Sequence, residues 1–204
     1  MKDRSFDPVL EFWFGALDDG LADDAHRHLW FNSGAEVDDT IRERFQHLVI
    51  AAKEGLLSPW LQQIKGRLAF VLVCDQFPRN IFRGLPAAFT YDALALDVAK
   101  KGVEIGTHRE LGYDERAFFY LPFQHSEQLD DQHTCVDLYT QLCDETPHGR
   151  RHVTGNNLRH AHQHRDIIAR FGRFPHRNIV LGRESSPEEL AFIAAGSGFG
   201  QQPR

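Results

Sequence analysis

Two copies of one short proline-containing element constrain the fold of this chain more than any other feature of its sequence. Residues 77–84 read Phe-Pro-Arg-Asn-Ile-Phe-Arg-Gly, and residues 174–183 read Phe-Pro-His-Arg-Asn-Ile-Val-Leu-Gly-Arg. Because proline disfavours a helical conformation at the residue before it, each copy is predicted to form a turn at the end of a helix. Two matching turns about a hundred residues apart indicate a helical hairpin that is used twice, as in helical-repeat proteins.

Apolar residues recur at helical intervals along most of the chain. Between residues 36 and 53 they occupy positions 37, 41, 45, 48, 49 and 52, which lie on one face of a helix. Residues 67–77 are apolar nearly all round, and we interpret them as a buried central helix because no partner strands are evident. No segment combines alternating polar and apolar residues with hairpin turns. The sequence therefore predicts an all-α protein.

Local signals predict the ends of several helices. Gly102 is expected to end a helix over residues 86–101, and Pro122 to interrupt a short helix over residues 115–121. Ser126 is predicted to cap the N-terminus of the helix that follows, because its hydroxyl group can accept a hydrogen bond from a free backbone amide.

Length and composition bound the class of protein. The 204 residues suffice for one helical domain with its own core, and a division into two pseudo-repeated halves, about 1–105 and 106–204, stays open. No apolar run approaches the ~20 residues that span a bilayer, and the first residues do not resemble a signal peptide. Three cysteines without a CxxC pair indicate a reduced protein in the cytoplasm.

The charges are distributed unevenly along the sequence. A net charge of −6 argues against a dedicated nucleic-acid-binding protein, and we expect neither nucleic acid nor a membrane as a partner. Residues 148–183, however, contain eight arginines and a single acidic residue, Asp166. Either this segment pairs with the acidic parts of the chain, or its surplus arginines build an anion site, since arginine holds planar anions through two parallel hydrogen bonds.

The two proline elements supply most of the predicted anion site. Their four arginines are expected to converge on one anion; the alternative is that the arginines and asparagines only bond the carbonyl groups of their own turns. A second expectation concerns polar residues at helix ends or on an otherwise apolar helix face, at least four of which should lie in one buried polar network: Asp75, Arg79, His125, Glu127, His164 and Arg173. The residues predicted to bind a small anion are Arg79, Asn80, Arg83, His164, Arg173, Arg177, Asn178 and Arg183.

Three residues are candidates for proton transfer: Asp75, His125 and Glu127. Asp75 lies four residues before Arg79, so it either forms an ion pair that braces the turn or acts as a general base with a raised pKa. His125 titrates near neutral pH and is a candidate proton shuttle, although such a histidine often donates to a backbone carbonyl group instead. Glu127, two residues further on, is expected near the start of a helix, where the helix dipole stabilises its charge.

Signatures of bound metals and cofactors are weak. His160 and His164 have the i, i+4 spacing that can present two imidazoles to one metal ion, but the glutamate of an HExxH motif is absent. Neither a GxSxG motif, a Walker loop nor a dinucleotide-binding GxGxxG motif in its required context occurs. We therefore predict neither a metal nor a cofactor.

Three strings of the sequence resemble a bacterial family of unknown function, domain of unknown function 924. They are Asp-Gln-Phe-Pro-Arg-Asn at 75–80, Leu-Pro-Phe-Gln-His-Ser-Glu at 121–127 and Phe-Gly-Arg-Phe-Pro-His-Arg-Asn at 171–178. Residues 12–15 and 185–189 are similar to the family as well, so the resemblance covers nearly the whole chain. One departure is Gln124, where the family commonly has methionine. The resemblance implies an all-helical fold similar to tetratricopeptide repeats, and it implies no activity.

Three functions follow as hypotheses. The first is a binding protein with a central pocket for a small anion, lined by Arg, His, Asp and Glu side chains. The second is a hydrolytic or proton-transferring enzyme that uses Asp75, His125 and Glu127. The third is a peptide or protein adaptor, which a tetratricopeptide-like array of helical hairpins suggests by analogy; a groove lined by exposed aromatic residues would favour it.

Overall fold

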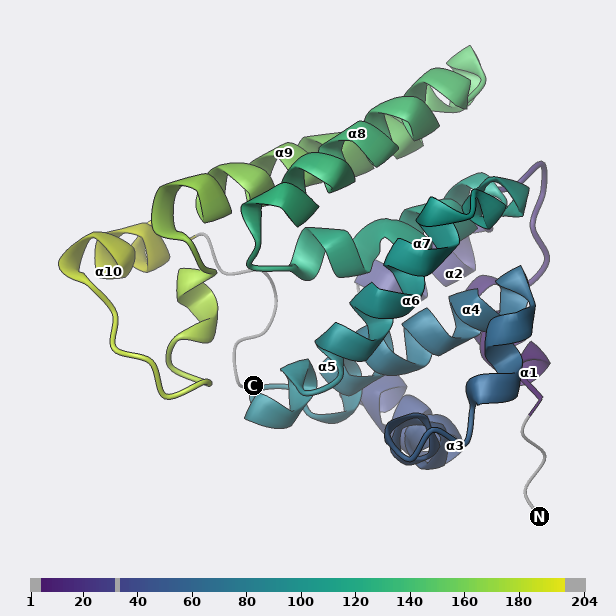
Figure 1. Ribbon diagram of the computed structural model, residues 1–204, viewed down its shortest axis with the longest axis horizontal. Helices are drawn as coiled ribbons and strands as arrows, with labels where there is room; N and C mark the ends of the chain where they lie inside the picture. Colours follow the sequence, from purple (N-terminus) through teal and green to yellow (C-terminus); the bar gives the residue numbers. More distant parts are fainter. Residues whose placement is uncertain (1–4, 32–33, 197–204) are drawn as a thin grey trace.

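Helix follows helix along residues 5–31 and 34–196, which are the residues that the computed structural model describes (Figure 1). Within these ranges the backbone forms no strand, only an isolated bridge between Asp18 and Leu21, so the predicted all-α fold is confirmed. The α-helices are α1 (Asp7–Phe14), α2 (Asp24–Phe31), α3 (Ala35–Lys53), α4 (Ile64–Val71), α5 (Phe77–Ile81), α6 (Asp92–Glu104), α7 (Tyr113–His125), α8 (Leu129–Glu145), α9 (Arg151–Phe171) and α10 (Pro187–Ala194).

The long helices α8 and α9 form a hairpin that lies above the remaining helices in Figure 1, with α7 between this hairpin and α4. The α10 helix lies at the other end of the molecule from α1. None of the helices in the described ranges combines the length and the apolar character that crossing a membrane would require.

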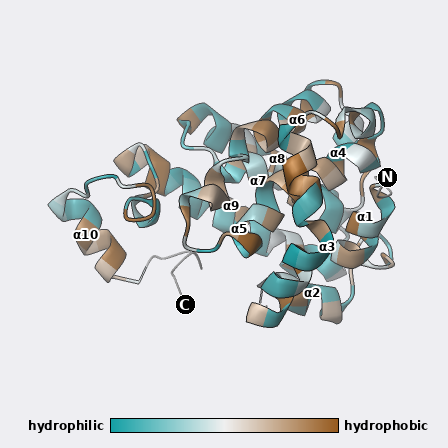
Figure 2. Cartoon of the chain, turned by 90° about the horizontal axis from the view of Figure 1, so that it is seen from below, coloured by the Kyte–Doolittle hydropathy of each residue, from teal (hydrophilic) through white to brown (hydrophobic). Residues whose placement is uncertain are grey.

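One large hydrophobic core joins α1 to the middle of α9. Hydrophobic residues concentrate where α4, α7 and α8 meet (Figure 2), and the apolar run from Leu68 to Cys74 is almost completely buried there. The prediction of a buried central helix is confirmed. Aromatic rings pack edge to face around it; the rings of Trp13 and Phe118, for example, lie 5.5 Å apart. A smaller cluster of Ile167, Ile168 and Phe174 forms at the end of α9.

The first proline element is not the predicted turn. A π-helix, Leu72–Gln76, leads directly into α5, and the backbone amide of Phe77 donates to the carbonyl group of Leu72 five residues earlier. Pro78 lies in the first turn of α5, where the missing N–H group has no helical partner to lose. The chain turns only after α5, at Gly84, which has a φ of +76°.

The second proline element does follow a helix end. Gly172 ends α9 in the left-handed conformation, with a φ of +68°, and Pro175–Arg177 then form a single 3₁₀ turn. The two copies therefore differ in backbone conformation, and the prediction of two matching turns is wrong.

Three predicted helix ends are also wrong. Gly102 does not end α6 but lies inside it. A Cβ atom at this position would lie 2.5 Å from the Phe119 ring, so glycine is required for α6 to approach α7 closely. Pro122 lies inside α7, which continues to His125. Ser126 follows α7 instead of capping α8; its hydroxyl group donates to Asp131 and accepts the amide of Gln128, the actual N-cap.

Candidate functional site

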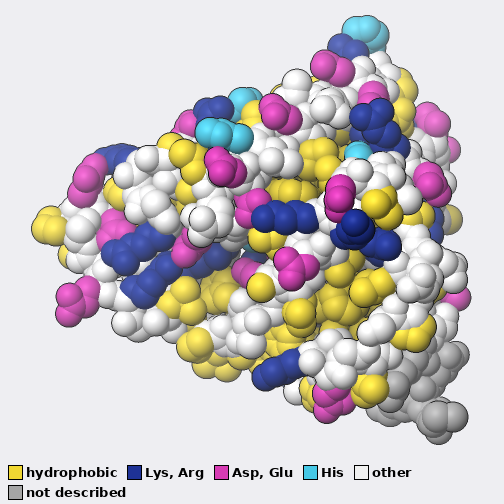
Figure 3. Space-filling model, viewed as in Figure 1, with side chains coloured by type: hydrophobic (Ala, Val, Ile, Leu, Met, Phe, Trp, Pro, Cys, Tyr) yellow, Lys and Arg dark blue, Asp and Glu magenta, His cyan; other side chains and the backbone are white. Residues whose placement is uncertain are grey.

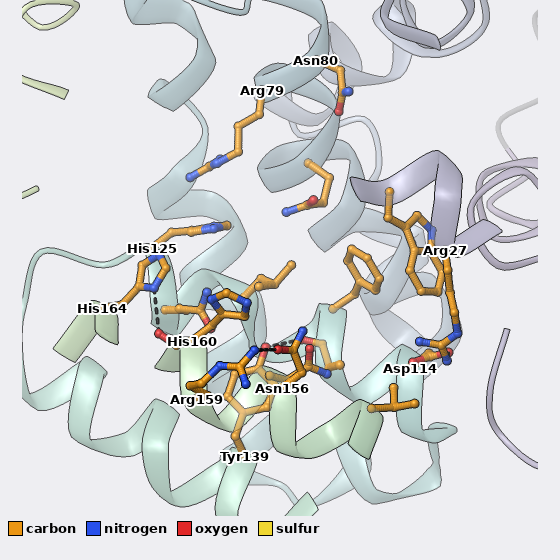
Figure 4. A pocket seen from close by; sticks show the side chains of 18 of the residues that line it. Arg27, Arg79, Asn80, Asp114, His125, Tyr139, Asn156, Arg159, His160 and His164 are labelled. Carbon is orange, nitrogen blue, oxygen red and sulfur yellow. Dashed lines mark hydrogen bonds and ion pairs between the residues drawn. The ribbon is translucent and has the colours of Figure 1, made fainter. Parts of the chain in front are cut away.

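A polar cleft of about 880 Å³ is lined by residues of α2, α5, α7 and α9 (Figure 4). Four arginines line it: Arg27, Arg79, Arg83 and Arg159. Four histidines line it as well: His125, His152, His160 and His164. Only two carboxylates, those of Asp24 and Asp114, belong to the same lining. The cleft is therefore rich in hydrogen-bond donors and in groups that can carry positive charge.

One face of α7 forms the floor of the cleft. Residues 114, 117, 118, 121, 124 and 125 all line it, which is the spacing of one helical stripe. The middle of this stripe is apolar, and its last turn is polar, with Gln124 and His125. The side-chain amide of Gln124 has no hydrogen-bond partner within the described residues, and the residue is only 7% exposed.

His125 and Asp75 form a buried pair at the inner wall of the cleft. The π-helix brings Asp75 to α7, and Nδ1 of His125 lies 2.7 Å from Oδ1 of Asp75. The amide of Gln76 donates to the other carboxylate oxygen at 2.6 Å, and the Arg79 guanidinium lies 3.3 Å from Oδ1. Both oxygens of Asp75 are thus occupied, so the orientation of the carboxylate is fixed.

These contacts set the charge of the pair. Burial raises the pKa of Asp75, but the charges of Arg79 and His125 and the hydrogen bonds outweigh it and hold this pKa below its usual value. The prediction of a general base with a raised pKa at Asp75 is wrong. Burial and the charge of Arg79 lower the pKa of His125. A neutral His125 donates from Nδ1 to Asp75, which leaves Nε2 as a hydrogen-bond acceptor.

His164 lies next to this pair on α9. Its ring centroid is 6.5 Å from that of His125, and its Nδ1 bonds the carbonyl oxygen of His160 at 2.8 Å. Burial lowers the pKa of His164 to about 3, so its imidazole is neutral at pH 7. No three metal-ligating side chains of the described residues meet in a way that could hold a metal ion.

Glu127 does not belong to the Asp75–His125 pair. It binds Arg183 through both carboxylate oxygens, at 2.7 and 3.1 Å, and accepts the backbone amide of Phe174 at 2.8 Å. Burial raises the pKa of Glu127, but these donors outweigh it and lower the pKa. Glu127 therefore fastens the second proline element to the loop after α7, and its predicted catalytic role is not supported by this geometry.

The four arginines of the proline elements do not converge on one anion, because carboxylates hold them in different places. Arg83 pairs with Asp38 at 2.9 Å, and Arg183 pairs with Glu127. Arg79 binds both oxygens of Asp92, at 2.8 and 2.9 Å. The alternative of internal pairing describes these four residues better, since a buried guanidinium needs a partner.

Arg79 and Arg177 nevertheless meet. Both guanidinium groups lie over the ring of Phe89, at 5.6 and 4.8 Å from its centroid, and Arg177 is 3.8 Å from Asp92. Arg177 also lies 4.4 Å over the ring of Phe174. Because Arg177 is buried, its pKa is lowered to about 10. Its charge is thus stabilised by aromatic faces and one shared carboxylate.

The predicted site residues divide into two groups. Arg79, Asn80, Arg83, His125 and His164 line the cleft, and Asp75 lies behind His125. The second group lies outside the lining: Glu127, Arg173, Arg177, Asn178 and Arg183. Arg173 binds Glu189 at 2.7 Å, and the amide of Asn178 donates to Ser185. These two contacts hold α10 and the segment before it.

A comparison with models of known protein families shows the family of this chain. The family described as "Bacterial protein of unknown function (DUF924)" matches residues 9–197. The chain belongs to this family. A solved structure of a protein of unknown function from Agrobacterium tumefaciens is 36% identical, with a TM-score of 0.79, over 94% of this chain and 97% of that one. No curated protein matches the chain.

The three strings that carry the resemblance to DUF924 lie together in the fold. The Asp75–His125 hydrogen bond joins the first string to the second, and the bond from the Phe174 amide to Glu127 joins the second to the third. The first and third strings meet where Arg79 and Arg177 share Asp92.

Several residues of the cleft were not predicted from the sequence. Arg27 binds Asp114 at 2.6 Å across 87 positions of sequence, and no local pattern reveals such a pair. Arg159, by contrast, follows His152 and Asn156 at intervals of one helical face. This spacing in the sequence indicates a polar face of α9, in addition to the pair of His160 and His164.

Proposed function

We propose that this protein binds a small molecule with at least one anionic group in the cleft between α9 and α2, α5 and α7. The observation that carries the proposal is the gathering of four arginines from separate elements around one opening that has only two carboxylates in its lining. A volume of about 880 Å³ lies within the range of small-molecule sites.

Carboxylates hold three of these arginines in place, one from the lining itself and two from outside it. Asp114 binds Arg27, Asp38 binds Arg83, and Asp92 binds Arg79. A guanidinium group has five N–H donors, so one carboxylate can orient it without using all of them. Arg159 contacts the side chain of Asn156, a neutral group. The ligand would thus be held by directed, charge-assisted hydrogen bonds more than by a large net charge.

The aromatic residues of the cleft favour a small molecule over a peptide. Phe118 and Tyr139 are buried in the core, and Trp30 donates its indole N–H to the carbonyl group of Trp13. An adaptor was expected to have a peptide groove lined by exposed aromatic residues.

The tetratricopeptide-like arrangement of the hairpins and the cytoplasmic location remain part of this proposal. The free thiols of Cys74, Cys135 and Cys143 support the cytoplasmic location.

A thermal unfolding screen tests the proposal. Inorganic phosphate, citrate and a panel of phosphorylated and carboxylated metabolites are added to the protein, and a ligand of the folded state raises Tm. Arg159→Gln is expected to abolish the shift of any hit. Arg165→Gln is the matched control, because Arg165 is also on α9 but pairs with Asp166 outside the cleft. Equal shifts in both variants would reject the cleft as the binding site.

A further inference from the structure

His125 of the buried Asp75–His125 pair lines the same cleft, and the geometry of the pair suits proton transfer as well as ligand binding. We propose that the protein is a hydrolase of carboxylic esters with an anionic group, in which His125 is the general base. This inference rests on the proposed function for the choice of substrate class, but the role of His125 is argued from the pair itself.

The first step of the argument is the orientation of the imidazole. Nδ1 of His125 lies 2.7 Å from Asp75, whose carboxylate is completely buried and held by Gln76 and Arg79 as well. A carboxylate on Nδ1 fixes the tautomer with the proton on that nitrogen and leaves the lone pair on Nε2. His125 lines the cleft, and Nε2 has no hydrogen-bond partner within the part of the chain that the structure describes.

A second, independent observation is the side chain next to it. Gln124 lines the same cleft, the residue as a whole is 7% exposed, and its side-chain amide has no partner among the described residues. Since no protein group in the described ranges bonds this amide, it can bond a ligand in the cleft. As an N–H donor, it suits the oxygen of a polarised carbonyl group, the position where negative charge develops in ester hydrolysis.

The backbone around Asp75 supports a functional site as well. A π-helix places this carboxylate, and π-turns inside helical segments are frequent at functional sites. An ordinary brace between helices does not need a histidine that also lines an open cleft. The combination of a fixed carboxylate, an acceptor Nε2 and an unpartnered amide donor is what a general base and its electrophile-binding group require.

The reaction needs only water as a second reactant. Nε2 of His125 takes a proton from water while the water oxygen bonds to the carbonyl carbon, and the carbonyl oxygen becomes an anion near the Gln124 amide. The tetrahedral intermediate then collapses, the bond to the alcohol oxygen breaks, and that oxygen takes the proton from Nε2. The products are a carboxylic acid and an alcohol, and His125 returns to its neutral form.

The test compares two activated esters, 4-nitrophenyl acetate and mono-4-nitrophenyl succinate, which differ in a carboxylate. The protein is expected to hydrolyse both, the succinate ester faster. His125→Gln keeps an amide donor for Asp75 but removes the base, so the rate should fall by at least ~10²-fold. Gln124→Met, of similar volume, should lower the rate without abolishing it. His133→Ala on the exposed side of α8 is the control and should leave the rate unchanged.

The outcomes separate this inference from the proposed function. Thermal unfolding of each variant shows whether a lost rate reflects lost folding; a folded His125→Gln protein as active as the unmodified one overturns the inference. Hydrolysis of neither ester by a protein that binds anions also overturns it and leaves the proposed function intact. If both esters are hydrolysed equally and Arg159→Gln has no effect, the anion preference is wrong while the general base stands.

Discussion

The carboxylate of Asp75 lies 2.7 Å from Nδ1 of His125, although fifty positions of sequence separate the two residues. Arg79 and Gln76 hold the same carboxylate, so one buried charge has three partners from two segments of the chain. The pair links the central apolar helix to α7 and places an imidazole at the wall of the cleft. The contribution of the pair to the free energy of unfolding can be measured independently of any catalytic activity.

The first prediction concerns this buried carboxylate. Asp75→Asn removes the negative charge that faces Arg79 and accepts from His125, and Arg79 then retains Asp92 as its carboxylate partner. Breaking a buried ion pair by removing one partner costs about 3–5 kcal/mol, so the free energy of unfolding in urea should fall by roughly 3 kcal/mol. The exposed Asp166→Asn should change it by less than about 1 kcal/mol. Equal effects of the two substitutions would contradict the buried network.

The second prediction concerns pH and the buried histidines. Burial lowers the pKa of His164 to about 3 and of His176 to about 4, and it lowers the pKa of His125 as well. The unfolded chain takes up these protons below about pH 6.5, while the folded protein does not, so stability must fall as pH decreases. The loss begins near pH 6.5 and continues down to the folded pKa values.

Urea unfolding between pH 7 and pH 5 measures this effect. At pH 5 the neutral His164 alone should lower the free energy of unfolding by roughly 2 kcal/mol. This pH is about 1.5 units below the pKa of histidine in the unfolded chain, and each unit costs about 1.4 kcal/mol. His164→Asn, if it folds, should flatten the dependence, whereas His133→Ala on the surface should not. A stability that is constant over this range would show that the histidines are not held neutral.

The secondary structure was largely predictable, because it depends on local sequence. Helical spacing identified residues 36–53, which form α3. Most of the errors in helix ends share one physical cause. Proline and glycine were interpreted as breaks, yet Pro78 fits a first helical turn and Gly102 fits a close helix contact, and only the neighbouring chain decides between these roles.

The candidate site was predictable only in part. Asp75, Arg79, His125 and His164 were expected in one polar network, and the structure brings these four together. The counter-charges Asp38 and Asp92 were not foreseen, because nothing local marks which carboxylate reaches which arginine. Long-range ion pairs are set by the packing of whole helices, and the expected convergence of arginines failed for that reason.

The third prediction concerns the link between Glu127 and the C-terminal segment. Glu127 binds both Arg183 and the Phe174 amide. Glu127→Gln should loosen residues 172–186 while the main core stays intact, so amide hydrogen exchange should accelerate in that segment and not in α4. A double-mutant cycle with Arg183→Gln should give a coupling energy of about 1 kcal/mol, since the pair is only partly exposed. Additive effects would show that the two residues are not coupled.

The last prediction tests the close approach of α6 and α7. A Cβ atom at Gly102 would lie 2.5 Å from Cζ of Phe119, whose ring is completely buried. Gly102→Ala should therefore destabilise the protein by about 1–3 kcal/mol in urea unfolding, in spite of the higher helix propensity of alanine. Gly155→Ala in α9 is the matched control, because its nearest contact is the Cys143 sulfur at 4.0 Å.

Helix propensity alone should make Gly155→Ala neutral or stabilising by up to about 1 kcal/mol. Combining Gly102→Ala with Phe119→Leu removes the ring that the new methyl group meets, so the double variant should lose less stability than the two single variants together. If Gly102→Ala is as stable as Gly155→Ala, the α6–α7 contact is looser than the structure shows. Gly102 would then not be required for the approach of α6 to the Phe119 ring of α7.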